Sequence, residues 1–178
     1  MTILGLGNHQ AAINVYVETA PNIPNLTDQE NCRWIRKNEI HAIGQQAGNG
    51  WRKVFNVYAK VVYELATKET CRYSSWQHYR DEQLLQQGSS FCLWLAVNSN
   101  EFQNKLSHHS GLNIVMGKGY ATRLNIAKQC FWLSEDFAIH QQKQLIICPY
   151  FDYRQLTNQK ITYLCQLITQ SFPSFISH

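Results

Sequence analysis

The chain has 178 residues, of which 44% are hydrophobic and 16% are charged, and its formal net charge is +4. This length fits one domain, and the apolar fraction is enough for a packed core, so a wholly disordered chain is excluded. The mean hydropathy is −0.35, and no apolar run approaches the roughly 18 residues that a membrane span needs. The basic residues are scattered, so the charge favours an anionic partner only mildly.

The first elements expected in chain order are a strand and two helices. Apolar and polar residues alternate over 13–19, which predicts a strand that ends before Pro21. The motif Thr-Asp-Gln-Glu at 27–30 has the form of a capping box and predicts a helix over 28–46. Apolar residues at steps of three and four predict a second helix over 51–67. Its expected buried face is Trp51, Val54, Phe55, Tyr58, Val61, Val62 and Leu65.

The middle of the chain predicts two short helices and two buried strands. A helix over 74–87 is expected to stop at Gly88. The continuous apolar run over 90–97 is typical of a central strand, with a buried helix as the competing interpretation. A short helix over 101–106 then leads to a strand over 112–116.

The last part of the chain predicts mostly helix around one more strand. Residues 120–142 read as helical in two pieces, although Phe131, Trp132 and Leu133 are ambiguous. A fourth strand over 144–148 stops at Pro149, and a final helix over 158–171 follows. Strands separated by helices predict an α/β fold with right-handed crossovers. We therefore expect one domain over 1–178, with a mostly parallel sheet of about four strands flanked by helices in three layers.

The six cysteines show no CxxC pair and no zinc-type spacing. Most stand in apolar stretches, so we interpret them as buried thiols, with disulfides as the less favoured alternative. Unpaired thiols and the lack of a secretory signal pattern predict a cytoplasmic protein. The neighbouring His108 and His109 would point in different directions on either a helix or a strand. No metal site and no cofactor are therefore expected.

Polar, glycine-rich or aromatic residues follow all four predicted strands. In a parallel sheet these strand ends meet at one edge, where ligands bind. The residues expected to line a site there are Glu18, Asn22, Asn98, Gly117, Lys118, Gly119 and Tyr150. The turn at 117–119 predicts an anion contact through its amides and Lys118, with an ordinary tight turn as the alternative. Tyr150 or Phe151 would stack on a planar ring, or would instead fasten this loop to the last helix.

The residues that end these strands resemble those of the uracil-DNA glycosylase superfamily. Ala20 and Pro21 resemble its water-activating loop, residues 95–98 resemble its strand ending in a base-reading Asn, and residues 115–118 resemble its third strand. The resemblance implies a small three-layer α/β domain that binds a flipped base at the carboxyl edge of four parallel strands. In that case Glu18 would orient the attacking water, although Thr19 aligns with that position as well.

The chain departs from the same family at the loop after the last strand. Cys148 stands where the family has the histidine of a His-Pro loop, so the resemblance implies the fold more directly than the activity.

Three functions follow as alternatives. The first is binding of a small anionic ligand, nucleotide-like or base-like, without chemistry. The second is a glycosylase-like hydrolase in which Glu18 is the catalytic residue and Asn98 reads the base. The third is a non-catalytic protein-partner or structural module. The mild positive charge is compatible with nucleic acid, and no membrane partner is expected.

Overall fold

A computed structural model gives the fold and describes residues 4–24, 26, 32–65 and 69–176. Within these residues, eight strands form one sheet in the order β3-β1-β4-β2-β5-β8-β7-β6. The strands are β1 (Leu4–Gly7), β2 (Ile13–Val17), β3 (Cys32–Arg33), β4 (Phe91–Leu95), β5 (Leu112–Met116), β6 (Phe131–Trp132), β7 (Ala138–His140) and β8 (Leu145–Cys148). The helices of four residues or more are α1 (Glu39–Ala47), α2 (Asn49–Glu64), α3 (Trp76–Glu82), α4 (Ser99–His108), α5 (Lys118–Arg123) and α6 (Asn158–Ser171).

The four predicted strands are confirmed, and they form the parallel centre of the sheet. They are β4, β2, β5 and β8, which lie side by side and run in the same direction. All four are buried along their whole length. A strand covered on both faces has no solvent side, which explains why 90–97 reads as one apolar run rather than an alternation.

The expectation of about four mostly parallel strands is too small, because the sheet is larger and mixed. On one side β1 pairs antiparallel with β4 and parallel with the two-residue β3. On the other side β8, β7 and β6 form an antiparallel series. The sequence of β1, Leu-Gly-Leu-Gly, carries little strand signal because glycine is depleted in strands.

The helix predicted over 28–46 is wrong in its first half. Residues 27–31, which hold the capping-box motif, lie outside the described residues. Cys32 and Arg33 are extended and pair with β1, and the Ile35 N–H donates to the Leu85 carbonyl. The helix begins only at Glu39, after Asn38 turns the chain with a φ of 67°. It ends at Ala47, one residue beyond the predicted end.

The two helical pieces predicted over 120–142 are also wrong. The first helix there, α5, ends at Arg123, and a single 3-10 turn, η1, covers Ala127–Gln129. The chain then forms the β6–β7 hairpin, whose turn is closed when the N–H groups of Leu133 and Ser134 donate to the Phe137 carbonyl. Cross-strand pairing of the ambiguous aromatic segment with β7 therefore replaces the expected helix.

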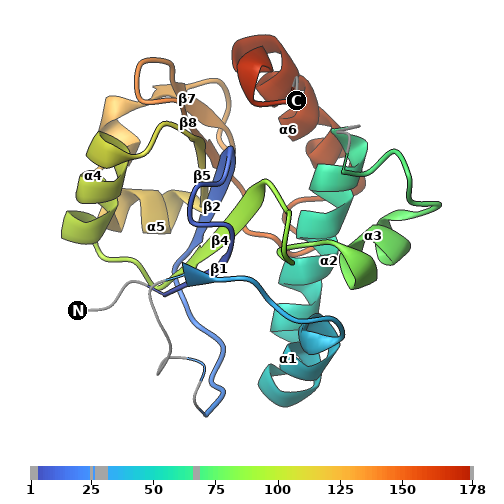
Figure 1. The fold of residues 1–178 in the computed structure, drawn as a ribbon. Helices are drawn as coiled ribbons and strands as arrows, with labels where there is room; N and C mark the ends of the chain where they lie inside the picture. The colour runs from blue at the N-terminus through green and yellow to red at the C-terminus, as the bar shows by residue number, and fades with distance from the viewer. Residues whose placement is uncertain (1–3, 25, 27–31, 66–68, 177–178) are drawn as a thin grey trace.

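Helices cover both faces of the sheet and create two hydrophobic clusters. Figure 1 shows α4 and α5 on one side of the sheet and α1, α2, α3 and α6 on the other. The larger cluster lies under α2 and α6, and the predicted apolar face of α2 is buried in it. The smaller cluster lies under α4 and α5. Within the described residues, no helix combines the length and the apolar character needed to cross a membrane.

Candidate functional site

The carboxyl ends of the four parallel strands lie level with one another. Leu95 is opposite Val17 in the register, and Met116 is opposite Cys148. Because neighbouring strands are about 4.8 Å apart, the segments that follow them start side by side. These segments are 18–24 after β2, 96–98 after β4, 117–119 after β5 and 149–153 after β8. Together they are called the carboxyl edge below.

Neighbouring strands send their connections to opposite faces of the sheet at this edge. β4 leads into α4 and β5 leads into α5, which pack on the face of the smaller cluster. The segment after β2 packs Ala20, Ile23 and Leu26 against the larger cluster before the chain forms β3, and β8 leads into α6 on the same face. Strand ends at which the connections diverge in this way are the general ligand-binding position of open α/β sheets.

Glu18 lies at the end of β2 and forms a bidentate ion pair with Arg123 at the end of α5. The Arg123 Nε donates to Glu18 Oε1, and its Nη2 donates to Glu18 Oε2 at 2.6 Å. Both side chains are exposed, with fractional exposures of 42% and 60%. A two-point pair fixes the plane of the carboxylate, and both of its oxygens already accept a hydrogen bond.

Tyr150 is half-buried at the end of β8 and joins the β2 segment through its hydroxyl. That hydroxyl shares a hydrogen bond with Thr19, while burial raises the tyrosine pKa. On the other side of Glu18, the buried Tyr120 donates its hydroxyl to the Val97 carbonyl at 2.8 Å. The pKa of Tyr120 is raised by burial and by the charge of Glu18. The two phenols therefore stay protonated, and each links two segments whose strands lie two positions apart in the sheet.

The segment 117–119, which joins β5 to the first turn of α5, is shaped by glycine and carries an exposed lysine. Gly117 has a φ of 94°, a conformation that favours glycine, and its N–H donates to the Cys148 carbonyl at 2.7 Å. The Lys118 ammonium lies 4.7 Å from the centroid of the Trp132 ring. A side chain at Gly119 would come within 3.4 Å of the Arg123 guanidinium. This segment thus holds one cation, Lys118, against an aromatic ring, and its Gly119 lies beside a second cation, Arg123.

Asn98 has a clear structural role as the N-cap of α4. Its Oδ1 accepts from the Glu101 N–H at 3.0 Å, and a Glu101 carboxylate oxygen accepts from the Asn98 N–H at 3.0 Å. This reciprocal capping box accounts for an exposed amide directly after a buried strand. The side-chain oxygen is occupied, so any ligand would meet the amide nitrogen.

The segment after β8 divides into a buried and an exposed part. Phe151 is fully buried and packs edge-on against Tyr58, with ring centroids 5.7 Å apart. It therefore fastens the loop to α2 and cannot stack on a ligand. Asp152 pairs with Lys53 of α2 at 3.1 Å, and its pKa is lowered by the Arg154 N–H and by Lys53. Tyr153 is 53% exposed, and the Lys53 ammonium lies 4.9 Å from its ring centroid.

The predicted site residues all lie on the carboxyl edge, but they do not all contact one another. Glu18 and Gly119 meet at the Arg123 guanidinium. Tyr150 reaches the same β2 segment through Thr19. Asn22 is exposed in its loop, Asn98 is engaged with α4, and Lys118 faces Trp132. Their partners on this edge were not predicted, because the contacts join positions far apart in the sequence.

The position at which the sequence departs from the glycosylase pattern, Cys148, lies outside this site. Cys148 is fully buried, and burial raises the pKa of its thiol. It therefore cannot take the place of the loop histidine in contact with a ligand. Among the described residues, no group of three or more His, Cys, Asp or Glu side chains is arranged to hold a metal ion.

A protein-family model matches residues 4–169 of the chain, and its description is a family of unknown function, DUF6942. No curated protein and no solved structure matches the chain.

Proposed function

We propose that this chain, which belongs to the family of unknown function DUF6942, binds a small anionic ligand with a planar ring, such as a nucleotide, at its carboxyl edge. The observation that carries the proposal is the divergence of the connections of β4, β2, β5 and β8 to opposite faces of the sheet. This arrangement is the general ligand-binding position of open α/β sheets.

The charges at this edge favour an anion. Glu18 and Asp152 are each paired with a cation, from Arg123 and Lys53. The exposed Lys118 ammonium faces an aromatic ring instead of a carboxylate. A lysine ammonium is a mobile point charge with three donors, so it can leave the ring for a phosphate oxygen.

Tyr150 is the ring best placed to contact a planar ligand. It follows β8, beside the β5 turn that carries Lys118, and its hydrogen bond to Thr19 fixes one end of the side chain. Stacking on an aromatic ring contributes about 1–3 kcal/mol per base. A ring with an attached phosphate would thus use both neighbouring segments.

Calorimetric titration tests this proposal with inorganic phosphate, two nucleobases and the corresponding nucleoside monophosphates. A charge-assisted contact is worth about 1.5–3 kcal/mol, so Lys118→Ala should raise the nucleotide Kd by about tenfold or more. The same variant should leave the nucleobase Kd unchanged, because a free base has no phosphate.

Lys60→Ala is the matched control for this titration. The Lys60 ammonium also lies over an indole ring, 5.1 Å from the centroid of Trp76, but it belongs to α2 and not to the carboxyl edge. The Lys60→Ala variant should therefore bind every ligand with the same affinity as the wild type. Equal nucleotide affinity in Lys118→Ala and wild type would remove Lys118 from the site, and a failure of all ligands to bind would overturn the proposal.

Hydrolysis of a glycosidic bond to a base is the alternative activity for the same edge. The exposed Glu18 carboxylate, fixed at the end of β2 beside Pro21, favours it as a group that could orient water. The ion pair with Arg123 competes with that role, and so binding remains our first proposal. Release of uracil from uracil-containing single-stranded DNA, lost in Glu18→Gln, would establish the hydrolase instead.

A further inference from the structure

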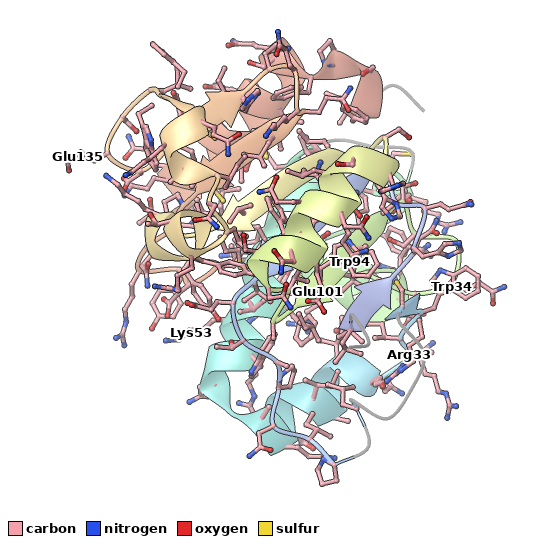
Figure 2. All side chains as sticks on the ribbon, turned by 90° about the vertical axis from the view of Figure 1, so that its left-hand side faces the viewer. Arg33, Trp34, Lys53, Trp94, Glu101 and Glu135 are labelled. Atoms are coloured by element: carbon pink, nitrogen blue, oxygen red, sulfur yellow. The ribbon has the colours of Figure 1, made fainter. Side chains whose placement is uncertain are left out.

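A second group of reactive side chains lies away from the carboxyl edge, on the face of the sheet covered by α4. It consists of Cys32 on β3, Cys92 and Trp94 on β4, and Lys105 on α4, and is called the thiol cluster below. Figure 2 shows Trp94 and Glu101 on this side of the molecule, with Arg33 and Trp34, which follow Cys32, to their right. The proposed ligand site does not use any of these residues.

Two thiols meet in this cluster because the residue that lies between them, Gly5, has no side chain. β1 runs between β3 and β4, yet the Sγ atoms of Cys32 and Cys92 are 3.6 Å apart. A side chain on Gly5 would stand 2.6 Å from the six-membered ring of Trp94 and 3.1 Å from the Cys32 Sγ. The missing side chain therefore lets the thiols and the indole pack together over β1.

A buried lysine supplies positive charge to the same place. Lys105 is only 7% exposed, and its ammonium lies 3.1 Å from the centroid of the Trp94 ring. The indole is fixed because its Nε1–H donates to Asn14 Oδ1 at 2.9 Å. Burial lowers the pKa of Lys105, while the charges of Cys92, Cys32 and Glu101 act to raise it.

The charged and titratable neighbours of Lys105 include both thiols. His109, one turn further along the chain, has a lowered pKa because of burial and the charge of Lys105. It is therefore neutral near pH 7 and adds no charge to the cluster. A desolvated ammonium favours a neighbouring anion, and the cysteines are the groups of the cluster that can provide one.

The two thiols differ in burial and in the direction of their pKa shifts, so one can be the thiolate while the other stays protonated. Cys92 is fully buried, and burial raises its pKa, so it keeps its proton. Cys32 is half-buried on the edge strand β3. Its pKa is lowered by the hydrogen bond with Cys92 and by Lys105, against the opposite effect of burial. Cys32 can thus be the thiolate, with the Cys92 S–H as its donor.

We propose that Cys32 is a modification site at which peroxide-class oxidants convert the thiolate to a sulfenic acid. The Cys32 sulfur attacks one peroxide oxygen, an S–O bond forms and the O–O bond breaks. Hydroxide leaves and takes a proton from solvent to become water. The sulfur loses two electrons and the peroxide gains them. Lys105 and the Cys92 S–H stabilise the Cys32 thiolate that attacks the peroxide.

The product stays a sulfenic acid instead of forming a Cys32–Cys92 disulfide. Cys32 and Cys92 lie on strands on either side of β1, and their Sγ atoms are 3.6 Å apart. A disulfide needs sulfur atoms about 2.05 Å apart and Cα atoms within about 7 Å. Forming the bond would require β3 and β4 to approach each other across β1. The sulfenic acid is therefore available to a small external thiol, which would restore Cys32 or cap it.

The test treats the folded protein with hydrogen peroxide in the presence of dimedone, which traps sulfenic acids, and locates the adducts by mass spectrometry. We expect the adduct on Cys32 to form faster than on Cys71, which is exposed. Lys105→Met should slow the Cys32 reaction by about tenfold by removing the charge, whereas Lys105→Arg should retain it. Circular dichroism checks that each variant is folded.

The pH dependence of iodoacetamide alkylation of the wild type gives a second, independent measurement. Between about pH 8 and pH 7 the alkylation rate of N-acetylcysteine, measured alongside as an ordinary thiol, should fall by nearly tenfold, and the Cys32 rate should change much less. Preferential labelling of Cys71, an equal rate in Lys105→Met, or a Cys32–Cys92 disulfide would each overturn the proposal. These outcomes are independent of nucleotide binding.

Discussion

At the residue scale, the absence of a side chain at Gly5 on β1 lets the side chains of Cys32 on β3 and Trp94 on β4 pack closely together. Gly5 stands opposite both Cys32 and Trp94 in the strand register. A methyl group there would overlap the Trp94 ring, which cannot move away because its Nε1–H is bonded to Asn14. The backbone angles of Gly5 are not the reason for glycine at this position, since its φ is not in the positive region.

Gly5→Ala should therefore destabilise the protein. Overpacking a dense interior costs about 1–3 kcal/mol, which urea unfolding followed by tryptophan fluorescence would measure. Gly50→Ala is the control, because a side chain there meets nothing within 4 Å and α2 gains a better helix former. It should leave the free energy of unfolding unchanged or raise it by up to about 1 kcal/mol. An equal loss in both variants would contradict this account.

The positions of the candidate site residues could be predicted from the sequence, and their contacts could not. Glu18, Asn98 and Lys118 follow apolar runs whose ends are visible in the sequence. The partner of Glu18 is Arg123, which lies 105 positions away. Such a pair depends on the packing of α5 against the strand ends, and no local pattern encodes it.

At the scale of elements, Asn98 joins a strand end to a helix start and so has two possible roles. Asn98→Ala should cost about 1 kcal/mol of stability through loss of the α4 cap. Asn98→Asp should keep most of the stability, because a carboxylate also caps a helix and favours its N-terminus.

Comparing the two Asn98 variants separates the cap from the binding role. If the amide nitrogen contacts a ligand, Asn98→Asp should weaken binding in the calorimetric titration while thermal unfolding stays near that of the wild type. Full affinity in Asn98→Asp would leave Asn98 with the structural role alone.

Elements with a regular pattern were predicted well, and elements defined by their partners were not. The long helices α2 and α6 and the four central strands each show their burial in the sequence. The strands β3 and β6 have two residues each and exist only through pairing with β1 and β7. A motif of this length carries no periodicity, so tertiary contacts decide its conformation.

At the scale of the whole molecule, one sheet forms a wall of both hydrophobic clusters. Val15 and Tyr16 are neighbours in β2, yet they belong to opposite clusters. Loss of β2 from the sheet would open both cores at once. The two clusters should therefore unfold together in one cooperative transition.

Two phenylalanine variants test this cooperativity. Phe55 on α2 is buried in the larger cluster, and Phe102 on α4 is buried in the smaller one, where it packs edge-on against Tyr16. Each change to alanine should lower the free energy of unfolding by about 3–5 kcal/mol. Circular dichroism and fluorescence should still report a single coincident transition in urea. A separate early transition in either variant would show that the clusters unfold independently.

The place of β1 in the sheet also affects folding during synthesis on the ribosome. Leu4 pairs with Leu95, so β1 leaves the ribosome long before the strand on which it lies. Translation proceeds at about 5–20 residues per second, so β4 is synthesised roughly 5–20 seconds after β1. β2 is also synthesised before its partners, because it pairs with β4 and β5. During that interval the α1–α2 segment is the first part that can form structure by itself, and the nascent chain exposes two apolar strands that a chaperone could hold.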